Sequence, residues 1–74
     1  MAAESAVLGV LAPGGLLSAN QITVQAQLTS WSVRRAIRQL SARGLIVHAP
    51  YQARWSITQR GQHVWAVKQR RFAK

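Results

Sequence analysis

A helical pattern of apolar residues in the middle of the chain constrains its fold most. Four apolar residues recur there at positions i, i+3, i+4 and i+7: Val33, Ala36, Ile37 and Leu40. Residues at this spacing share one face of an α-helix. Thr29 precedes the run as a suitable N-cap, and Gly44 follows it where a left-handed residue commonly ends a helix. The pattern therefore predicts a helix over about residues 30–43 with this face buried.

Two shorter helices are predicted before this one. Apolar residues at helical spacing predict a first helix over residues 3–12, which the Pro-Gly-Gly sequence after it ends. A short apolar step, Leu16–Leu17, follows. Ser18 with Gln21 three residues later has the pattern of a capping box, which predicts a second helix over about residues 19–27.

A β-hairpin is predicted after the central helix. Residues 45–47 are rich in β-forming side chains, and residues 54–58 alternate around Trp55 and Ile57. The segment between them, which includes a proline, has the composition of a turn. The pattern predicts a hairpin over about residues 45–58.

A last helix is predicted over about residues 59–71, with Thr58 placed to cap it. Val64 and Val67 fall on one side and form its expected inner face, although Gly61 is unfavourable in the first turn. Trp65 lies about a quarter turn from that side. It is either a dimer contact, made together with the first helix, or a side chain packed on the domain's own core.

Charge is the strongest compositional feature. Ten Lys and Arg stand against one acid, Glu4, which gives a net charge of +9, and all ten cations lie at or after position 34. Internal ion pairs are therefore expected to leave most of this charge unneutralised, and self-repulsion destabilises the fold unless an anion binds. An apolar fraction of 49% in 74 residues argues for a folded chain and for a single domain over residues 1–74.

The same composition argues against several classes of protein. With a single acidic side chain, the protein cannot use a pair of carboxylates for acid–base catalysis. A Ser-His-acid triad would depend on Glu4, which lies near the terminus. Two histidines without cysteine do not make a typical metal site, and no nucleotide-binding glycine motif is present. The apolar stretch 6–17 is too short to span a bilayer, and no cation precedes it as an export signal requires. We therefore expect that the protein is not an enzyme, that it holds no cofactor or metal, and that it has no membrane partner. We expect its location to be cytoplasmic and nucleoid-associated.

In this order the elements resemble a winged helix-turn-helix protein. Residues 22–40 look like the helix-turn-helix core, and the Arg-Gly-Leu-Ile sequence at 43–46 resembles the exit into the wing. Residues 55–61 resemble the end of the wing in MarR-like and other small bacterial or phage regulators. The resemblance covers roughly residues 6–67. Gln27 departs from the family pattern, because the tight turn there usually has a glycine.

The resemblance implies an α+β winged helix-turn-helix fold: a three-helix core, a two-stranded β-hairpin wing and a C-terminal helix. It also implies a small, basic, prokaryotic regulator of transcription that binds specific double-stranded DNA. The recognition helix, 30–43, would enter the major groove, and the wing would lie on the adjacent backbone or minor groove. No sensing domain is expected to fit in the chain, so no small-molecule effector is evident.

Seven residues of the recognition helix are candidates for DNA contact: Ser30, Trp31, Ser32, Arg34, Arg35, Arg38 and Gln39. At 100° per residue, Trp31 and the three arginines point away from the buried face. Arginine can hold both acceptors of a guanine edge, and the exposed amides at a helix start attract phosphate. The alternative is that the arginines only form a solvated face. Trp31 either contacts DNA or a partner, or packs under the turn.

The remaining candidates lie outside this helix face. In the wing they are Tyr51, Gln52 and Arg54, and the candidates for contact with the DNA backbone are Ser18, Thr29 and Arg43. The basic segment 68–74 either touches flanking phosphate or is a frayed end. His48 and His63 are expected to be wing and surface residues.

Three other functions remain open on the sequence alone. An architectural or recombination-directionality factor of the excisionase kind has the same signature, and a bending assay separates it from a regulator. A winged helix used as a protein–protein interaction module predicts an apolar or acidic face in place of the arginines. A cationic membrane-surface peptide would need a wide apolar face throughout, which the predicted hairpin interrupts.

Overall fold

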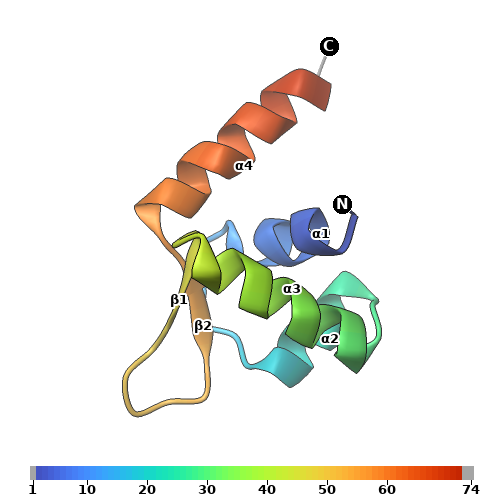
Figure 1. The fold of residues 1–74 in the computed structure, drawn as a ribbon, viewed down its shortest axis with the longest axis vertical. Coiled ribbons are helices and arrows are strands. Elements are labelled where there is room, and N and C mark those ends of the chain that lie inside the picture. The colour runs from blue at the N-terminus through green and yellow to red at the C-terminus, as the bar shows by residue number, and fades with distance from the viewer. Residues whose placement is uncertain (1, 73–74) are drawn as a thin grey trace.

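The computed structural model describes the backbone of residues 2–72 and the side chains of residues 3–68. Four helices and one two-stranded antiparallel sheet follow each other along the chain (Figure 1). Their bounds are α1 Ala2–Leu11, α2 Ala19–Ala26, α3 Ser30–Ala42, β1 Ile46–His48, β2 Trp55–Ile57 and α4 Gln59–Phe72. The α+β winged helix-turn-helix fold predicted from the sequence is confirmed.

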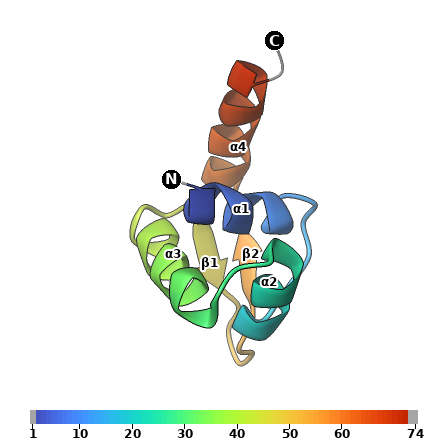
Figure 2. The ribbon, with the colours of Figure 1, turned by 90° about the vertical axis from the view of Figure 1, so that its right-hand side faces the viewer.

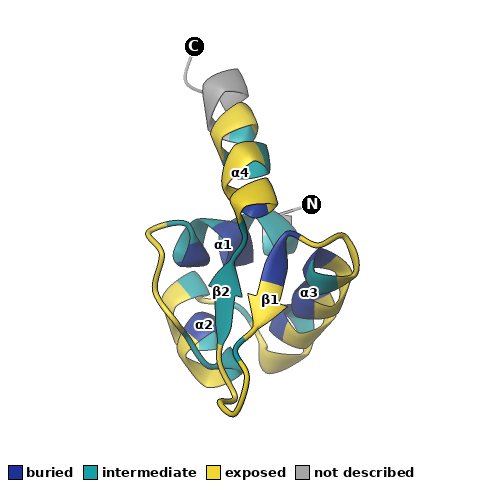
Figure 3. Ribbon diagram, turned by 90° about the vertical axis from the view of Figure 1, so that its left-hand side faces the viewer, coloured by how far each residue is buried: buried dark blue, intermediate teal, exposed yellow. Residues whose placement is uncertain are grey.

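The core lies where α1, α2 and α3 meet, with the start of the wing closing one side (Figure 3). The buried apolar residues are Val7, Leu8, Leu11, Ile22, Val33, Ala36, Ile37, Leu40, Leu45 and Ile46. The four residues of the predicted α3 face are all among them, which confirms that face. No polar or charged side chain is buried within the described part of the chain. Apolar burial therefore fixes where α3 sits and which way it is rotated.

The capping box of α2 is present as predicted. The Ser18 amide donates to Gln21 Oε1 at 2.9 Å, and the Gln21 amide donates to Ser18 Oγ at 3.2 Å. The helix ends at Gln27, which adopts the left-handed conformation with φ 57° and ψ 44°. The turn thus holds a non-glycine residue in a region that usually favours glycine.

The exit from α3 leads directly into the wing. Gly44 has φ +74°, and the Leu45 amide donates to Leu40 O at 3.0 Å, so the predicted left-handed helix end is confirmed. β1 then pairs with β2, with Ile46 opposite Ile57 and His48 opposite Trp55.

A third extended segment supports the base of the wing. The Leu17 amide donates to Trp55 O at 3.0 Å, and the Trp55 amide donates to Leu17 O at 2.7 Å. The short apolar step predicted at Leu16–Leu17 therefore pairs with the outer side of β2. β2 is therefore paired on both sides, with β1 on one edge and with Leu17 on the other.

α4 begins directly after Thr58 and projects from the rest of the molecule along its long axis (Figures 1 and 2). The Thr58 hydroxyl donates to Gly44 O at 2.7 Å and accepts from the Gly61 amide at 3.0 Å, which confirms the predicted cap. Gly61 lies so close to the chain crossing it that an added Cβ would be 2.1 Å from Leu45 O. The glycine that looked unfavourable for the helix is required by this approach.

The inner face of α4 differs from the predicted one. Gly61 is buried and Val64, Trp65 and Lys68 are half-buried, whereas Val67 is 42% exposed. The expectation that Val67 would share the inner face with Val64 is wrong. α4 therefore turns Gly61 toward Leu45 and Ile57 at the base of the wing, and Trp65 and Lys68 toward α1.

Three contacts hold α4 on α1 in antiparallel order. Gln62 Nε2 donates to Ala12 O at 2.7 Å, and Lys68 Nζ donates to Ser5 Oγ at 3.1 Å. Between them the Trp65 ring covers Gly9, where an added Cβ would lie 2.8 Å from the ring.

No helix in the described part of the chain combines the length and apolarity needed to cross a bilayer.

Candidate nucleic-acid interface

The exposed face of α3 carries the predicted recognition residues. Trp31 is 69% exposed, and the three arginines and Gln39 are exposed as well. A shallow open groove on this face is lined by Trp31, Arg34, Arg35, Arg38 and Gln39. Of the two positions considered for Trp31, the structure shows the exposed one.

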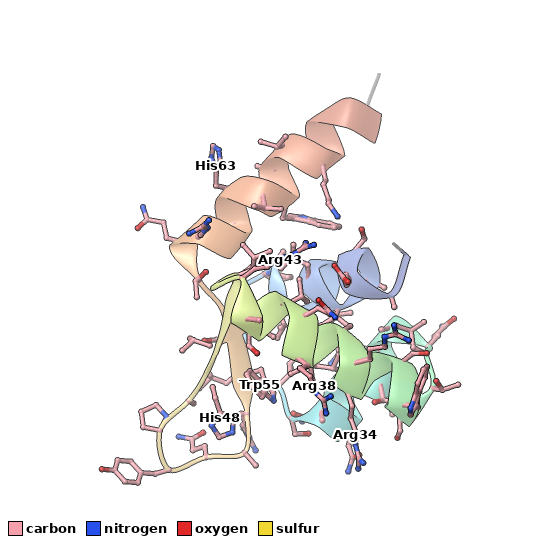
Figure 4. The ribbon with its side chains drawn as sticks, viewed as in Figure 1. Arg34, Arg38, Arg43, His48, Trp55 and His63 are labelled. Atoms are coloured by element: carbon pink, nitrogen blue, oxygen red, sulfur yellow. The ribbon has the colours of Figure 1, made fainter. Side chains whose placement is uncertain are left out.

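The arginines of α3 divide into two directions. The side chains of Arg34 and Arg38, one helical turn apart, extend toward the end of the molecule where the wing lies (Figure 4). Arg35 instead stacks on Trp31, with its guanidinium carbon 5.4 Å from the ring centroid. This contact between a cation and an aromatic face holds both side chains against the helix. Arg34 and Arg38 are therefore oriented together, and Arg35 forms a unit with Trp31.

The hydroxyl groups near the helix starts have structural partners. Thr29 Oγ1 accepts from the Ser32 amide at 3.1 Å and lies 3.0 Å from Ser32 Oγ. Ser18 is occupied in the capping box of α2. Ser30 lies exposed in the first turn of α3, next to the unpaired amides of the helix start. Contact of these residues with DNA remains a prediction.

The wing presents its polar residues at the tip. Tyr51, Gln52 and Arg54 are exposed, and Tyr51 has φ 64°. The Ala49 amide donates to Arg54 O at 2.9 Å and closes the loop. Arg54 thus stands at the end of a short, paired hairpin.

His48 has a more defined place than the sequence suggested. Its ring lies edge-on against Trp55, with centroids 4.8 Å apart and planes at 63°. The register of the hairpin could have signalled this contact, because His48 lies directly opposite Trp55. His48 is itself exposed, as expected from the sequence. The pair stiffens the wing beside Arg54.

Two predicted site residues lie apart from this surface. Arg43 points away from Arg34 and Arg38 and forms an ion pair with Glu4, at 3.5 Å between Nη1 and Oε1 (Figure 4). The only acid of the chain therefore neutralises one cation at the far end of α3, through a partly exposed pair of small energetic value. Trp65 packs over Gly9 within the chain, which is the alternative considered for it. A dimer contact by the rest of its ring remains a prediction.

No group of three or more metal-ligating side chains occurs among the described residues. The described surface around α3 and the wing offers cations, amides, hydroxyls and aromatic rings. These are the groups that bind phosphate oxygens and base edges.

No protein-family model matches the sequence, and no curated protein matches it. Solved structures do resemble it. A MarR family transcriptional regulator from Silicibacter pomeroyi DSS-3 superposes with a TM-score of 0.81 at 22% identity, over 96% of this chain and 54% of that one. MepR of S. aureus in complex with DNA gives 0.77 at 20% identity, over 96% and 63%. Another MarR family transcription regulator gives 0.77 at 22% identity, over 96% and 53%.

The chain thus spans little more than half of two of these neighbours and 63% of MepR. The superposition covers both motif helices, the wing and the helices before and after them, because it includes nearly the whole chain. At this level of identity the likeness establishes architecture. The chain has the winged helix-turn-helix fold found in MarR family regulators.

Proposed function

We propose that the protein is a transcriptional regulator that binds specific sequences of double-stranded DNA through α3 and the wing. One observation carries the proposal: the exposed face of α3 and the wing tip are cationic and contain no acid, on a fold that one neighbour presents in a complex with DNA. Such a face is electrostatically unfavourable until it meets an anion.

The two arginines that extend together are the proposed base readers. Arg34 and Arg38 are four residues apart, which is about 6 Å along a helix axis. This rise corresponds to about two base-pair steps at 3.4 Å each. With α3 in the major groove, both guanidinium groups can reach neighbouring guanine edges, and each bidentate contact discriminates by about 1–3 kcal/mol.

The other predicted contacts surround this pair. Ser30 and the helix start of α3 are proposed to bind phosphate, and the Trp31–Arg35 unit to lie against the backbone on the side of α1. Arg54, with Tyr51 and Gln52, is proposed to contact the adjacent minor groove or backbone. Pairing of two copies through α1 and α4 would place two such surfaces on one operator.

A salt titration on two kinds of DNA tests the function. The protein is titrated with random duplex and with pooled genomic fragments of the parent organism, and binding is followed by fluorescence anisotropy and by sequencing of the retained fragments. With roughly five to seven phosphates neutralised, log K should fall with log salt at a slope of about −0.9 per phosphate. A few fragments should be strongly enriched.

Two other results of this titration would favour other functions. Uniform binding of all fragments, together with bending of the duplex, would favour an architectural factor of the excisionase kind. No binding at low salt would contradict the nucleic-acid function and favour a winged helix that binds protein.

A further inference from the structure

Tyr51 stands at the tip of the wing with its whole side chain in solvent. It is 105% exposed, more than any other large apolar side chain that the structure describes. An aromatic side chain in a folded protein usually buries about 150–250 Å² of surface. The three tryptophans of the chain, by contrast, each lie against another side chain or against a glycine. Packing within the described domain therefore does not account for an aromatic residue at this position.

The backbone at Tyr51 also favours a different residue. The Gln52 amide donates to Ala49 O at 3.4 Å, so these residues close a β-turn with Pro50 and Tyr51 at its two corners. Tyr51 has φ 64°, which gives the turn the pattern of type II. Proline suits the first corner of such a turn, whereas the second usually takes glycine, because a side chain is strained there. Strain of this kind in a bulky residue is typical of functional sites.

The tip is carried on a firm base. The Ala49 amide donates to Arg54 O at 2.9 Å and extends the pairing of β1 and β2 to the start of the loop. β2 is also paired with Leu17 along its other edge. The loop forms the end of the molecule opposite α4 (Figure 1), and Arg34 and Arg38 extend toward this end (Figure 4). The Tyr51 ring is therefore held out on the side where the proposed DNA contacts lie.

The minor groove of DNA fits this tip. The groove is about 6 Å wide and 7.5 Å deep, so a flat ring can enter it edge-on. Proteins that bend DNA from the minor groove insert apolar side chains between neighbouring base pairs, which partly unstacks the step and kinks the duplex. The loop around Tyr51 contains one cation, Arg54, and no acid, so phosphates can approach it on both sides of the ring.

A protein partner fits this tip less well than DNA does. The centre of a protein–protein interface contains several apolar side chains together, surrounded by a polar rim. In the loop 49–54, which the structure describes completely, Tyr51 is the single large apolar side chain that is exposed. One ring beside an arginine is instead what a groove with stacked bases and phosphate edges can accept.

We propose that the Tyr51 ring is a wedge that enters the minor groove beside the bases read by α3, unstacks one base-pair step and bends the duplex. The proposal deepens the function proposed above and rests on it, because α3 first places the wing on the DNA. Pyrimidine–purine steps such as TA and CA unstack most easily, so the wedge selects such a step at a fixed distance from the α3 contacts. Tyr51 would thus add sequence preference through the deformability of DNA.

Bending and step preference test the proposal. A duplex with the enriched fragment carries a dye at each end, and energy transfer between the dyes reports the bend when the full chain binds. A single 2-aminopurine, moved along the fragment in place of successive adenines, reports the step at which base stacking changes. That step is then replaced by the stiffer step AA, and anisotropy titrations compare the affinities of the two duplexes.

Three variants separate the ring from the rest of the wing. Tyr51→Gly removes the ring and suits the positive φ, so its melting temperature should stay near that of the wild type. Tyr51→Phe keeps the ring and removes only the hydroxyl. Val47→Ala is the matched control, because Val47 is another exposed apolar residue of the wing, at 51%.

The wild type, Tyr51→Phe and Val47→Ala should all bend the fragment and change the 2-aminopurine signal at one step. Tyr51→Gly should still bind the fragment through α3, without the bend and without the signal. Replacing the flexible step by AA should lower the affinity of the wild type about tenfold and that of Tyr51→Gly less than about threefold. Enrichment of a few fragments separates such a regulator from an architectural factor that bends every duplex.

Other outcomes would overturn the wedge. A wild-type complex with the enriched fragment in which the duplex stays straight and stacked would do so and leave the proposed function standing, whereas failure to bind any duplex would overturn both. Bending that persists in Tyr51→Gly would assign the bend to other contacts, and bending lost in Tyr51→Phe would assign it to the hydroxyl. A straight duplex, combined with self-association that Tyr51→Gly abolishes in sedimentation, would place the ring against a second copy of the chain.

Discussion

α3 and α4 are both basic helices, of 13 and 14 residues, yet the molecule holds them in different ways. α3 is fixed by four buried aliphatic side chains, and α4 by a glycine approach, one tryptophan and two side-chain hydrogen bonds. An element that recognises a base sequence has to hold its side chains in fixed positions, whereas backbone binding tolerates variation. The firmer burial of α3 supports the sequence reading proposed for it, whereas α4 depends on fewer contacts.

The largest effect is expected in the buried face of α3. Leu40 is 2% exposed, and Leu40→Ala should lower the free energy of unfolding by about 2–5 kcal/mol, because it removes buried methyl groups and leaves a cavity. In so small a domain this approaches the whole stability. Urea denaturation followed by circular dichroism measures it. Val24→Ala, at a position 74% exposed, is the control and should change little.

A smaller effect is expected where α4 meets the wing. Gly61→Ala places a Cβ against Leu45 O and Ile57 and should cost about 1–3 kcal/mol, since one of the two neighbours is backbone. Gly15→Ala is the matched control, because nothing lies within 4 Å of an added Cβ there. The melting temperatures of both variants, measured by thermal unfolding, are compared. Equal melting temperatures would show that α4 docks without this approach.

The caps of the two helices provide a finer comparison. Thr29→Ala removes a cap within one helix, whereas Thr58→Ala also removes the bonds to Gly44 O and Leu45 O. Each should cost about 0.5–2 kcal/mol, with Thr58→Ala the larger. Denaturation curves recorded side by side measure the order. A larger loss in Thr29→Ala would contradict the idea that Thr58 joins the wing to α4.

The smallest effect on stability is expected for the exposed arginines of α3. Arg34→Ala and Arg38→Ala should change the free energy of unfolding by no more than about 0.5 kcal/mol, because both side chains are exposed. Each should weaken binding to the enriched fragment in an anisotropy titration. Arg38→Lys then separates two roles: a base reader loses sequence preference with lysine, and a phosphate contact keeps it. Unfolding of either alanine variant would mean that the exposed face is misassigned.

Local patterns in the sequence predicted most of the fold. The α3 face, the caps at Ser18, Thr29 and Thr58, and the left-handed Gly44 were all found from spacing and residue type. These features depend on groups within a few residues of each other, so the chain's own order encodes them. The exposure of Arg34, Arg35 and Arg38 followed from the same spacing, because burying one face of a helix exposes the other. The sequence left the position of Trp31 open, and the structure decided it.

Only the tertiary structure decided the features that join distant segments. The pairing of Leu17 with Trp55, the close approach at Gly61 and the position of Trp65 over Gly9 bring together residues far apart in sequence. It also showed that Glu4 pairs with Arg43 and that Arg35 turns to Trp31 while Arg34 and Arg38 extend together. Sequence spacing determines which face of a helix is buried. The direction in which that helix meets its neighbours depends on packing between elements, as α4 shows, whose contacts lie at Gly9 and Gly61.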